Sequence, residues 1–75
     1  MRADLRSLLQ RLAQGERRFD NPTENLVDNL YTLQSYGWAR NVVAKRSVME
    51  GGHPYYLAAA LITEEGRLAL QEDDT

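Results

Sequence analysis

The sequence predicts a single small α+β domain with the order helix, short strand, helix, β-hairpin, helix. Leucines recur at helical spacing in two segments that precede Gly37. After Trp38 the apolar residues alternate instead, which is typical of a strand with one buried face. A cluster of turn residues then separates two apolar runs of strand length. A chain of 75 residues has room for one hydrophobic core.

The first predicted helix covers residues 3–14. Gly15 follows it as a C-terminal cap, and Arg11 lies in its last turn, where a cation complements the helix dipole. Glu16–Phe19 is compatible with a short strand. The residues expected to face the core are spaced at i, i+3, i+4 and i+7, and they are Leu5, Leu8, Leu9 and Leu12.

The second predicted helix begins after Asp20 and runs to about Tyr36. We expect Asn21 to cap it, Pro22 to take the first helical position and Glu24 to complete a capping box. Gly37 supplies a left-handed residue at its C-terminal end. Its expected buried stripe is Leu26, Leu30 and Leu33, with Val27 at the edge.

Residues 39–49 are predicted to form a strand, because Val42, Ala44 and Val48 alternate with Val43, Lys45 and Ser47. A Gly- and Pro-containing turn follows, and residues 55–62 form the second strand of an antiparallel hairpin.

Residues 54–70 also allow a competing interpretation as one continuous helix, because the alanines at positions 58–60 favour helix. Thr63 followed by two glutamates indicates a fresh helix start, and Gly66 would lie in the middle of the merged helix. We therefore predict a short third helix over residues 64–71. Residues 1–71 make the domain, and residues 72–75 are expected to be an acidic, frayed tail.

The composition is 43% hydrophobic and 27% charged, which is typical of an ordinary globular chain. The absence of cysteine excludes disulfides, thiolate metal sites and a cysteine nucleophile, and it fits a reducing compartment. No apolar run approaches membrane-spanning length, and the charged N-terminal segment differs from a signal peptide. We expect a cytoplasmic protein that does not associate with membranes.

The net charge of −2 argues against a generic binder of nucleic acid. Its distribution is uneven, however. Three acids lie in the last four residues, whereas residues 29–49 contain no acid and include Arg40, Lys45 and Arg46. The predicted hairpin is therefore locally basic.

Catalytic chemistry has little support in the sequence. The single histidine, His53, lies in a Gly-Gly-His-Pro turn with no partner residues placed nearby for a catalytic relay or a metal site. The Gly51-Gly52 pair lacks the Lys and Ser/Thr of a phosphate loop. We expect no catalytic residues, no metal and no cofactor, and a protein that is not an enzyme.

Residues 25–38 resemble the recognition-helix end of winged-helix proteins, with two leucines three apart before a glycine and an apolar residue. Pro54-Tyr55-Tyr56 and residues 61–68 (Leu-Ile-Thr-Glu-Glu-Gly-Arg-Leu) look like the second wing strand running into the helix start of bacterial regulators. The resemblance implies a winged-helix-like DNA-binding domain of a bacterial or phage transcription regulator, with the wing at residues 49–54. Pro22–Gly37 has room for one helix where a full helix-turn-helix has two, so the resemblance implies the scaffold more than the activity.

The candidate DNA contacts are of two kinds. Basic side chains on or beside the hairpin and before the second helix suit phosphates, and polar side chains of the second helix suit base edges. The alternatives are an ordinary solvated strand face and a simple polar helix face, since Glu24 and Asp28 would meet phosphates unfavourably. The candidates are Arg17, Arg18, Asn25, Asn29, Thr32, Arg40, Lys45, Arg46 and His53.

The leading functional hypothesis is a small regulator that binds double-stranded DNA through the hairpin wing and the second helix. The alternative is a winged-helix module that binds another protein without binding DNA. Tyrosine and tryptophan are enriched in protein interfaces, and this small chain has several. A homodimer would also enlarge the limited core of so short a chain.

Overall fold

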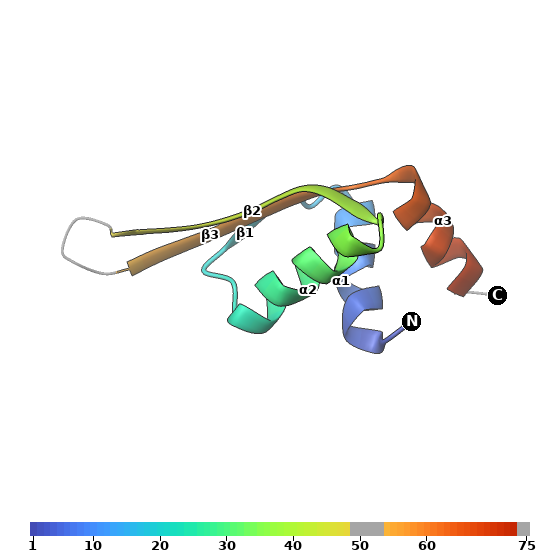
Figure 1. The fold of residues 1–75 in the computed structure, drawn as a ribbon, viewed down its shortest axis with the longest axis horizontal. Helices are drawn as coiled ribbons and strands as arrows, with labels where there is room; N and C mark the ends of the chain where they lie inside the picture. Colours follow the sequence, from blue (N-terminus) through green and yellow to red (C-terminus); the bar gives the residue numbers. More distant parts are fainter. Residues whose placement is uncertain (49–53, 74–75) are drawn as a thin grey trace.

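The computed structural model describes residues 1–48 and 54–73, which form three helices and a three-stranded antiparallel sheet (Figure 1). The sheet has the order β1-β3-β2, so the last strand lies between the other two. The small α+β architecture is as predicted. The elements in chain order are α1 (Ala3–Ala13), β1 (Arg18–Asp20), α2 (Glu24–Ser35), β2 (Ala39–Val48), β3 (Pro54–Ile62) and α3 (Glu64–Asp73).

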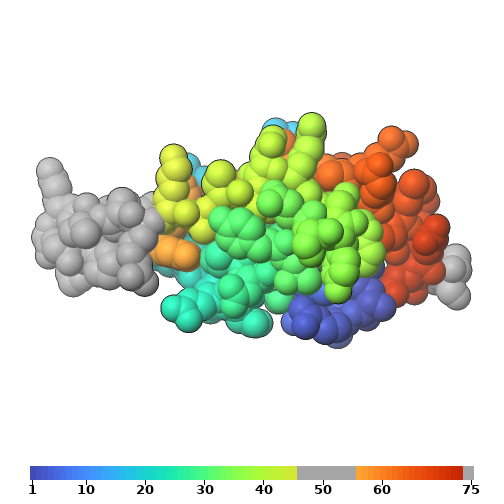
Figure 2. Space-filling view, viewed as in Figure 1, coloured from blue at the N-terminus to red at the C-terminus, as the bar shows by residue number. Residues whose placement is uncertain are grey.

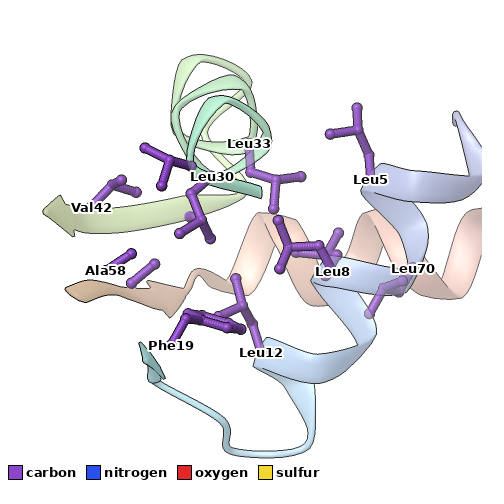
Figure 3. Close-up of a cluster of buried hydrophobic side chains, with 13 residues drawn as sticks. Leu5, Leu8, Leu12, Phe19, Leu30, Leu33, Val42, Ala58 and Leu70 are labelled. Atoms are coloured by element: carbon purple, nitrogen blue, oxygen red, sulfur yellow. The ribbon is translucent and has the colours of Figure 1, made fainter. Parts of the chain in front are cut away.

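Helices α1 and α2 cover one face of the sheet and bury its side chains. Figure 3 shows Leu30 of α2 near Val42 and Ala58, and Leu12 of α1 against Phe19 of β1. The four leucines predicted for the buried face of α1 are all buried. On α2 the buried stripe is Val27, Leu30 and Leu33, whereas Leu26 is only half-buried. The centre of this stripe is thus rotated slightly from the predicted one.

The start of α2 differs from the prediction. Thr23 is the N-cap, and its Oγ1 accepts a hydrogen bond from the Leu26 amide at 3.1 Å. Asn21 has a positive φ of 49° and extends the β1–β3 pairing instead: its amide donates to the Tyr56 carbonyl at 2.7 Å. Asparagine tolerates this left-handed conformation, and Thr23 is the next residue able to cap. The proposed Asn21 cap was therefore wrong.

The β2–β3 hairpin is present, so the interpretation of residues 54–70 as one helix was wrong. Strand β3 pairs with β2 from Pro54 to Ile62 and with β1 at Leu57–Ala59. Ala58 and Ala60 are fully or almost fully buried on the helix-covered face. Their small side chains leave room there for the leucines of α1 and α2, and this packing overrides the helical preference of alanine.

A β-bulge in β2 sets which side chains face the helices. The register passes from Arg40↔Leu61 to Val43↔Ala59, so Asn41 and Val42 together oppose one residue of β3. Asn41 takes a positive φ of 55°. The extra residue places Ala39 and Val42 on the same buried face, although simple alternation would separate them. The Val42 amide, displaced from the ladder, donates to Gln34 Oε1 of α2 at 3.1 Å.

The junction between β3 and α3 is fixed against the turn that follows α2. Thr63 Oγ1 donates to the Gly37 carbonyl at 2.6 Å and accepts from the Gly66 amide at 3.0 Å. The Thr63 amide donates to the Trp38 carbonyl at 3.0 Å. A Cβ at position 66 would overlap that carbonyl oxygen, so the close approach of α3 requires glycine. The predicted helix start after Thr63 is confirmed.

Helix α3 extends two residues past the predicted end at residue 71. Asp73, which we assigned to a frayed tail, ends α3 and forms an ion pair with Arg6 of α1 at 2.9 Å. Its other carboxylate oxygen lies 3.4 Å from the N-terminal ammonium. These two contacts hold the C-terminal end of α3 near α1, and the sequence did not indicate them. Residues 74 and 75 lie outside the described part.

Candidate nucleic-acid interface

The face of the sheet opposite α1 and α2 carries apolar residues in the centre and charged residues on both flanks. On β3, the side chains of Leu57, Ala59 and Leu61 alternate with the buried alanines and therefore belong to this face. We call this surface the open face. Its flanking residues, given by the strand register, are Arg18 and Asp20 on β1 and Arg40, Val43 and Lys45 on β2.

Three candidate cations thus share one face. Arg40 lies opposite Leu61, Lys45 opposite Leu57 and Arg18 opposite Ala59, so the pleat directs all three side chains to the same side. Arg18 forms an exposed ion pair with Asp20, with its Nε 3.2 Å from Oδ1. Within residues 1–48 and 54–73, neither Arg40 nor Lys45 is held in an ion pair. No ion pair within the described part of the chain therefore competes with a ligand for these two charges.

A hollow of about 220 Å³ lies at one end of the sheet, between the turn after α1, β3 and α3. Arg17, Arg40 and Arg67 line it, together with Leu61 and Ile62. We call it the arginine hollow. Arg67 extends from the first turns of α3 toward α1, and its Nη1 lies 3.5 Å from the Ala13 carbonyl oxygen. The arginines come from three separate segments of the chain, so only the fold brings them together.

The one acid that lines the arginine hollow is already paired. Arg11 donates two hydrogen bonds to the carboxylate of Glu16, at 2.8 and 2.7 Å. These bonds hold the pKa of Glu16 below its ordinary value and raise the pKa of Arg11. The same guanidinium lies over the Phe19 ring, 4.8 Å from its centre. Arg11 therefore neutralises Glu16 and anchors the turn that carries Arg17.

Arg67 was not among the candidates predicted from sequence. It follows Glu64 and Glu65 closely, so the sequence around it does not form a basic stretch. The helix separates these charges: Gly66 is buried, and Arg67 lines the arginine hollow. Gly66 and Leu70 are four residues apart and are both buried on one side of α3, and this spacing is the sequence signal that could have indicated the orientation.

Arg40 also borders a second, shallower hollow that contains Glu64 and Glu65. Both glutamates are exposed, and none of the ion pairs among the described residues joins either of them to Arg40. Their negative charge nevertheless weakens the attraction of this end of the sheet for anions. Any ligand of Arg40 must compete with them.

The candidates on α2 lie away from the open face, because α2 packs against the other face of the sheet (Figure 1). Asn25 is exposed in the first turn of α2 and borders a depression shared with Asp4 and Ser7 of α1. Thr32 is half-buried, and its hydroxyl donates to the Asp28 carbonyl at 2.9 Å. In Figure 2 the surface of α2, in green, lies below the strands.

Asn29 does not lie on the outer margin of α2, where we predicted it. It is buried, its Oδ1 accepts from Arg2 at 3.2 Å and its amide donates to Asp4 at 3.3 Å. The asparagine takes a position in the buried stripe and connects α2 with the start of α1. Its polar type led us to place it outside, and its hydrogen-bonding atoms are directed to the protein itself.

Two predicted contacts fall at the margin of the described part. Arg46 belongs to β2 and pairs with Tyr56 in the ladder, but its side chain lies outside the described residues. His53 and the predicted wing turn, residues 49–53, also lie outside them. The strands that lead to this turn extend past the N-terminal end of α2 (Figure 1).

Exposed aromatic side chains gather around the C-terminal half of α2. Tyr31 is 45% exposed and Tyr36 is 57% exposed. The Tyr36 ring lies 4.8 Å from the Trp38 ring, centre to centre, at an angle of 42°. Trp38 is half-buried against the core. Neither Tyr31 nor Tyr36 belongs to the hydrophobic core, so both are accessible for contacts with another molecule.

Comparison with protein-family models, curated protein sequences and solved structures finds no match to this chain. Among the described residues, no three histidine, aspartate or glutamate side chains converge as metal ligands. None of the described helices combines the length and apolarity needed to cross a bilayer.

Proposed function

We propose that this protein is a small DNA-binding regulator of transcription that contacts duplex DNA with the open face and the β2–β3 hairpin. The observation that carries this proposal is the alignment of Arg18, Arg40 and Lys45 on one face of the sheet. Phosphate contacts supply most of the sequence-independent affinity for DNA, and arginine and lysine are their usual donors. The negative net charge of the chain matters less than this local arrangement.

The proposal assigns the main contact to the strands rather than to α2. The exposed side of α2 carries Glu24 and Asp28 and no lysine or arginine. Carboxylates near phosphates are repelled, and α2 lies across the core from the open face. One DNA segment held against the cations of the open face is therefore out of reach of Asn25 and Thr32.

The scaffold we propose is a reduced winged helix. The order helix, strand, helix, hairpin and the sheet order β1-β3-β2 support it. A single helix, α2, stands between β1 and β2, where a helix-turn-helix has two. The loss of one helix explains why the hairpin, rather than a recognition helix, is left as the DNA contact.

The test is the affinity of the protein for duplex DNA, measured by fluorescence anisotropy at several salt concentrations. Arg40→Gln and Lys45→Gln should each weaken binding to all sequences and lower the salt slope by about 0.9, since each removes one phosphate contact. Arg2→Gln, which removes an equal charge on the opposite side of the sheet, is the control and should have a smaller effect. Undetectable binding at low salt would exclude the proposal.

The exposed tyrosines favour one alternative, a module that binds a protein. Tyr31 and Tyr36 are large and accessible. A second copy of the chain is one such partner, and sedimentation equilibrium across the micromolar range tests for it. Binding through these side chains should tolerate high salt, whereas binding to phosphates should not.

A further inference from the structure

We propose that the arginine hollow is a phosphate-binding site in which Arg17, Arg40 and Arg67 hold one phosphate group. This inference deepens the proposed function and rests on it where DNA supplies the phosphate. The site itself, however, is defined by its own geometry and can be tested without DNA.

The number and origin of the cations favour this assignment. Three arginines line one hollow, and the one acid among its lining residues, Glu16, is neutralised by the two hydrogen bonds from Arg11. Like charges brought together without an anion repel each other. An anionic ligand converts that repulsion into attraction, so the hollow is suited to bind one.

The chemistry of the donors selects phosphate among anions. Each guanidinium presents N–H groups in a planar fork that matches two oxygens of a phosphate or carboxylate. Three forks from different directions suit the tetrahedral oxygens of phosphate better than the planar oxygens of one carboxylate. The volume of about 220 Å³ leaves space for a phosphate group and several waters, each of which occupies about 30 Å³ in the liquid.

The surroundings hold two of the three arginines in place. Arg67 is directed toward α1 by its contact with the Ala13 carbonyl oxygen, 3.5 Å from Nη1. Arg17 begins the β1 pairing, where its carbonyl accepts from the Ala60 amide at 3.0 Å. The Arg67 side chain and the Arg17 backbone are therefore held by the fold before a ligand arrives, which lowers the ordering cost of binding.

Arg40 connects the arginine hollow with the open face. It lines the hollow, and the register places it on the same face as Lys45. A phosphate in the hollow would therefore lie at the end of the row of cations that we propose for the DNA backbone. Arg67 and Arg17 would extend that row beyond the strands to α3 and to the turn after α1.

The first experiment titrates the protein with pyrophosphate at constant ionic strength and follows the arginine side-chain Nε–Hε signals by NMR. We expect saturable shifts at Arg17, Arg40 and Arg67. Arg67→Gln and Arg17→Gln should each weaken binding about tenfold, the loss typical of one charge-assisted hydrogen bond. The matched control is Arg2→Gln, which removes the same charge outside the hollow and outside the open face, and should change the affinity less than twofold.

A second pair of variants tests whether nearby negative charge weakens pyrophosphate binding. Glu65→Gln removes an acid from the neighbouring hollow and should strengthen pyrophosphate binding, whereas Glu24→Gln on the far side of the core should not. All these side chains are exposed, so they can be changed without opening the core, and backbone amide spectra check that the fold is retained. No saturation by pyrophosphate, or equal losses in Arg2→Gln and Arg67→Gln, would overturn the proposal.

The source of the phosphate is decided by a duplex DNA titration of Arg67→Gln. If DNA occupies the hollow, the salt slope falls by about 0.9 and pyrophosphate competes with DNA. If a free phosphorylated molecule occupies it, pyrophosphate binds while DNA affinity is unchanged. Pyrophosphate binding without any DNA binding keeps the site and removes the proposed function. DNA binding without any pyrophosphate binding keeps the function and removes the site.

Discussion

The two faces of the sheet use the same strands for different purposes. On one face, Ala58 and Ala60 are almost completely buried beneath the leucines of α1 and α2. On the other, Leu57, Ala59 and Leu61 are half-buried with no helix over them, and arginine and lysine flank them. The aliphatic stems of such side chains can cover apolar neighbours while their charges stay in water. One face therefore supplies stability, and the other supplies the charge that we assign to binding.

The two faces should differ most in how much unfolding free energy is lost when a leucine is replaced by alanine. Leu30→Ala should lower the free energy of unfolding by about 2–5 kcal/mol, because Leu30 is fully buried against the sheet. Leu61→Ala on the open face should cost less than about 1.5 kcal/mol, because less surface is buried there. Urea unfolding followed by circular dichroism measures both. Equal losses would mean that the open face is also a structural core, covered by another chain.

Gly66→Ala tests whether the edge of the covered face is as tightly packed as the contacts indicate. In an exposed helix this change stabilises by up to about 1 kcal/mol. Here the new methyl group meets the Trp38 carbonyl oxygen, and we expect a loss of about 1–3 kcal/mol instead. The thermal unfolding midpoint of Gly66→Ala should therefore fall. An increase would show that α3 is not held against the turn after α2.

The bulge at Asn41 determines which residues of β2 reach each face. Alanine in this left-handed conformation should cost about 1–2 kcal/mol, whereas glycine should be nearly neutral. Asn41→Ala should therefore lower stability and Asn41→Gly should not, as measured by urea midpoints. If both variants behave alike, the conformation of residue 41 does not control the register.

The smallest expected effect concerns Glu16 beside the arginine hollow. Its pKa is lowered in the folded state by the hydrogen bonds from Arg11, so the pair stabilises the fold above the ordinary carboxyl value of 4.5. That contribution is lost as pH falls through the lower folded pKa. Because the pair is exposed, we expect Glu16→Gln to cost about 0.2–1 kcal/mol at pH 7 and much less near pH 3. An unchanged difference between these pH values would contradict the assignment.

Much of the fold followed from local patterns. The leucine spacing predicted α1, and the alternation of apolar residues predicted β2 and β3, because each pattern reflects which side of the element faces the core. The helix and both strands are present. The bulge was not predictable, because Ala39 and Val42 share a face only through the left-handed residue between them. The cap of α2 was misassigned because Asn21 and Thr23 both suit a helix start, and β3 decides between them.

The candidate interface was less predictable than the fold. Charge along the chain indicated Arg40 and Lys45, since no acid lies near them in sequence. The arginine hollow joins positions 17 and 67, which only the packing of α3 beside α1 brings together. Asn29 was misplaced for the opposite reason: it is a polar side chain at a buried position of α2, and its partners are Arg2, just before α1, and Asp4 of α1.

The measurement that tests the central claim most directly is an NMR titration of the isotopically labelled protein with duplex DNA, followed through backbone amides. If the open face binds the phosphates, the shifts should cluster on β2, on β3 and around Arg67 and Arg17. The outer side of α2, at Asn25 and Asp28, should remain unchanged. Shifts concentrated on α2, or no shifts at low salt, would contradict the account.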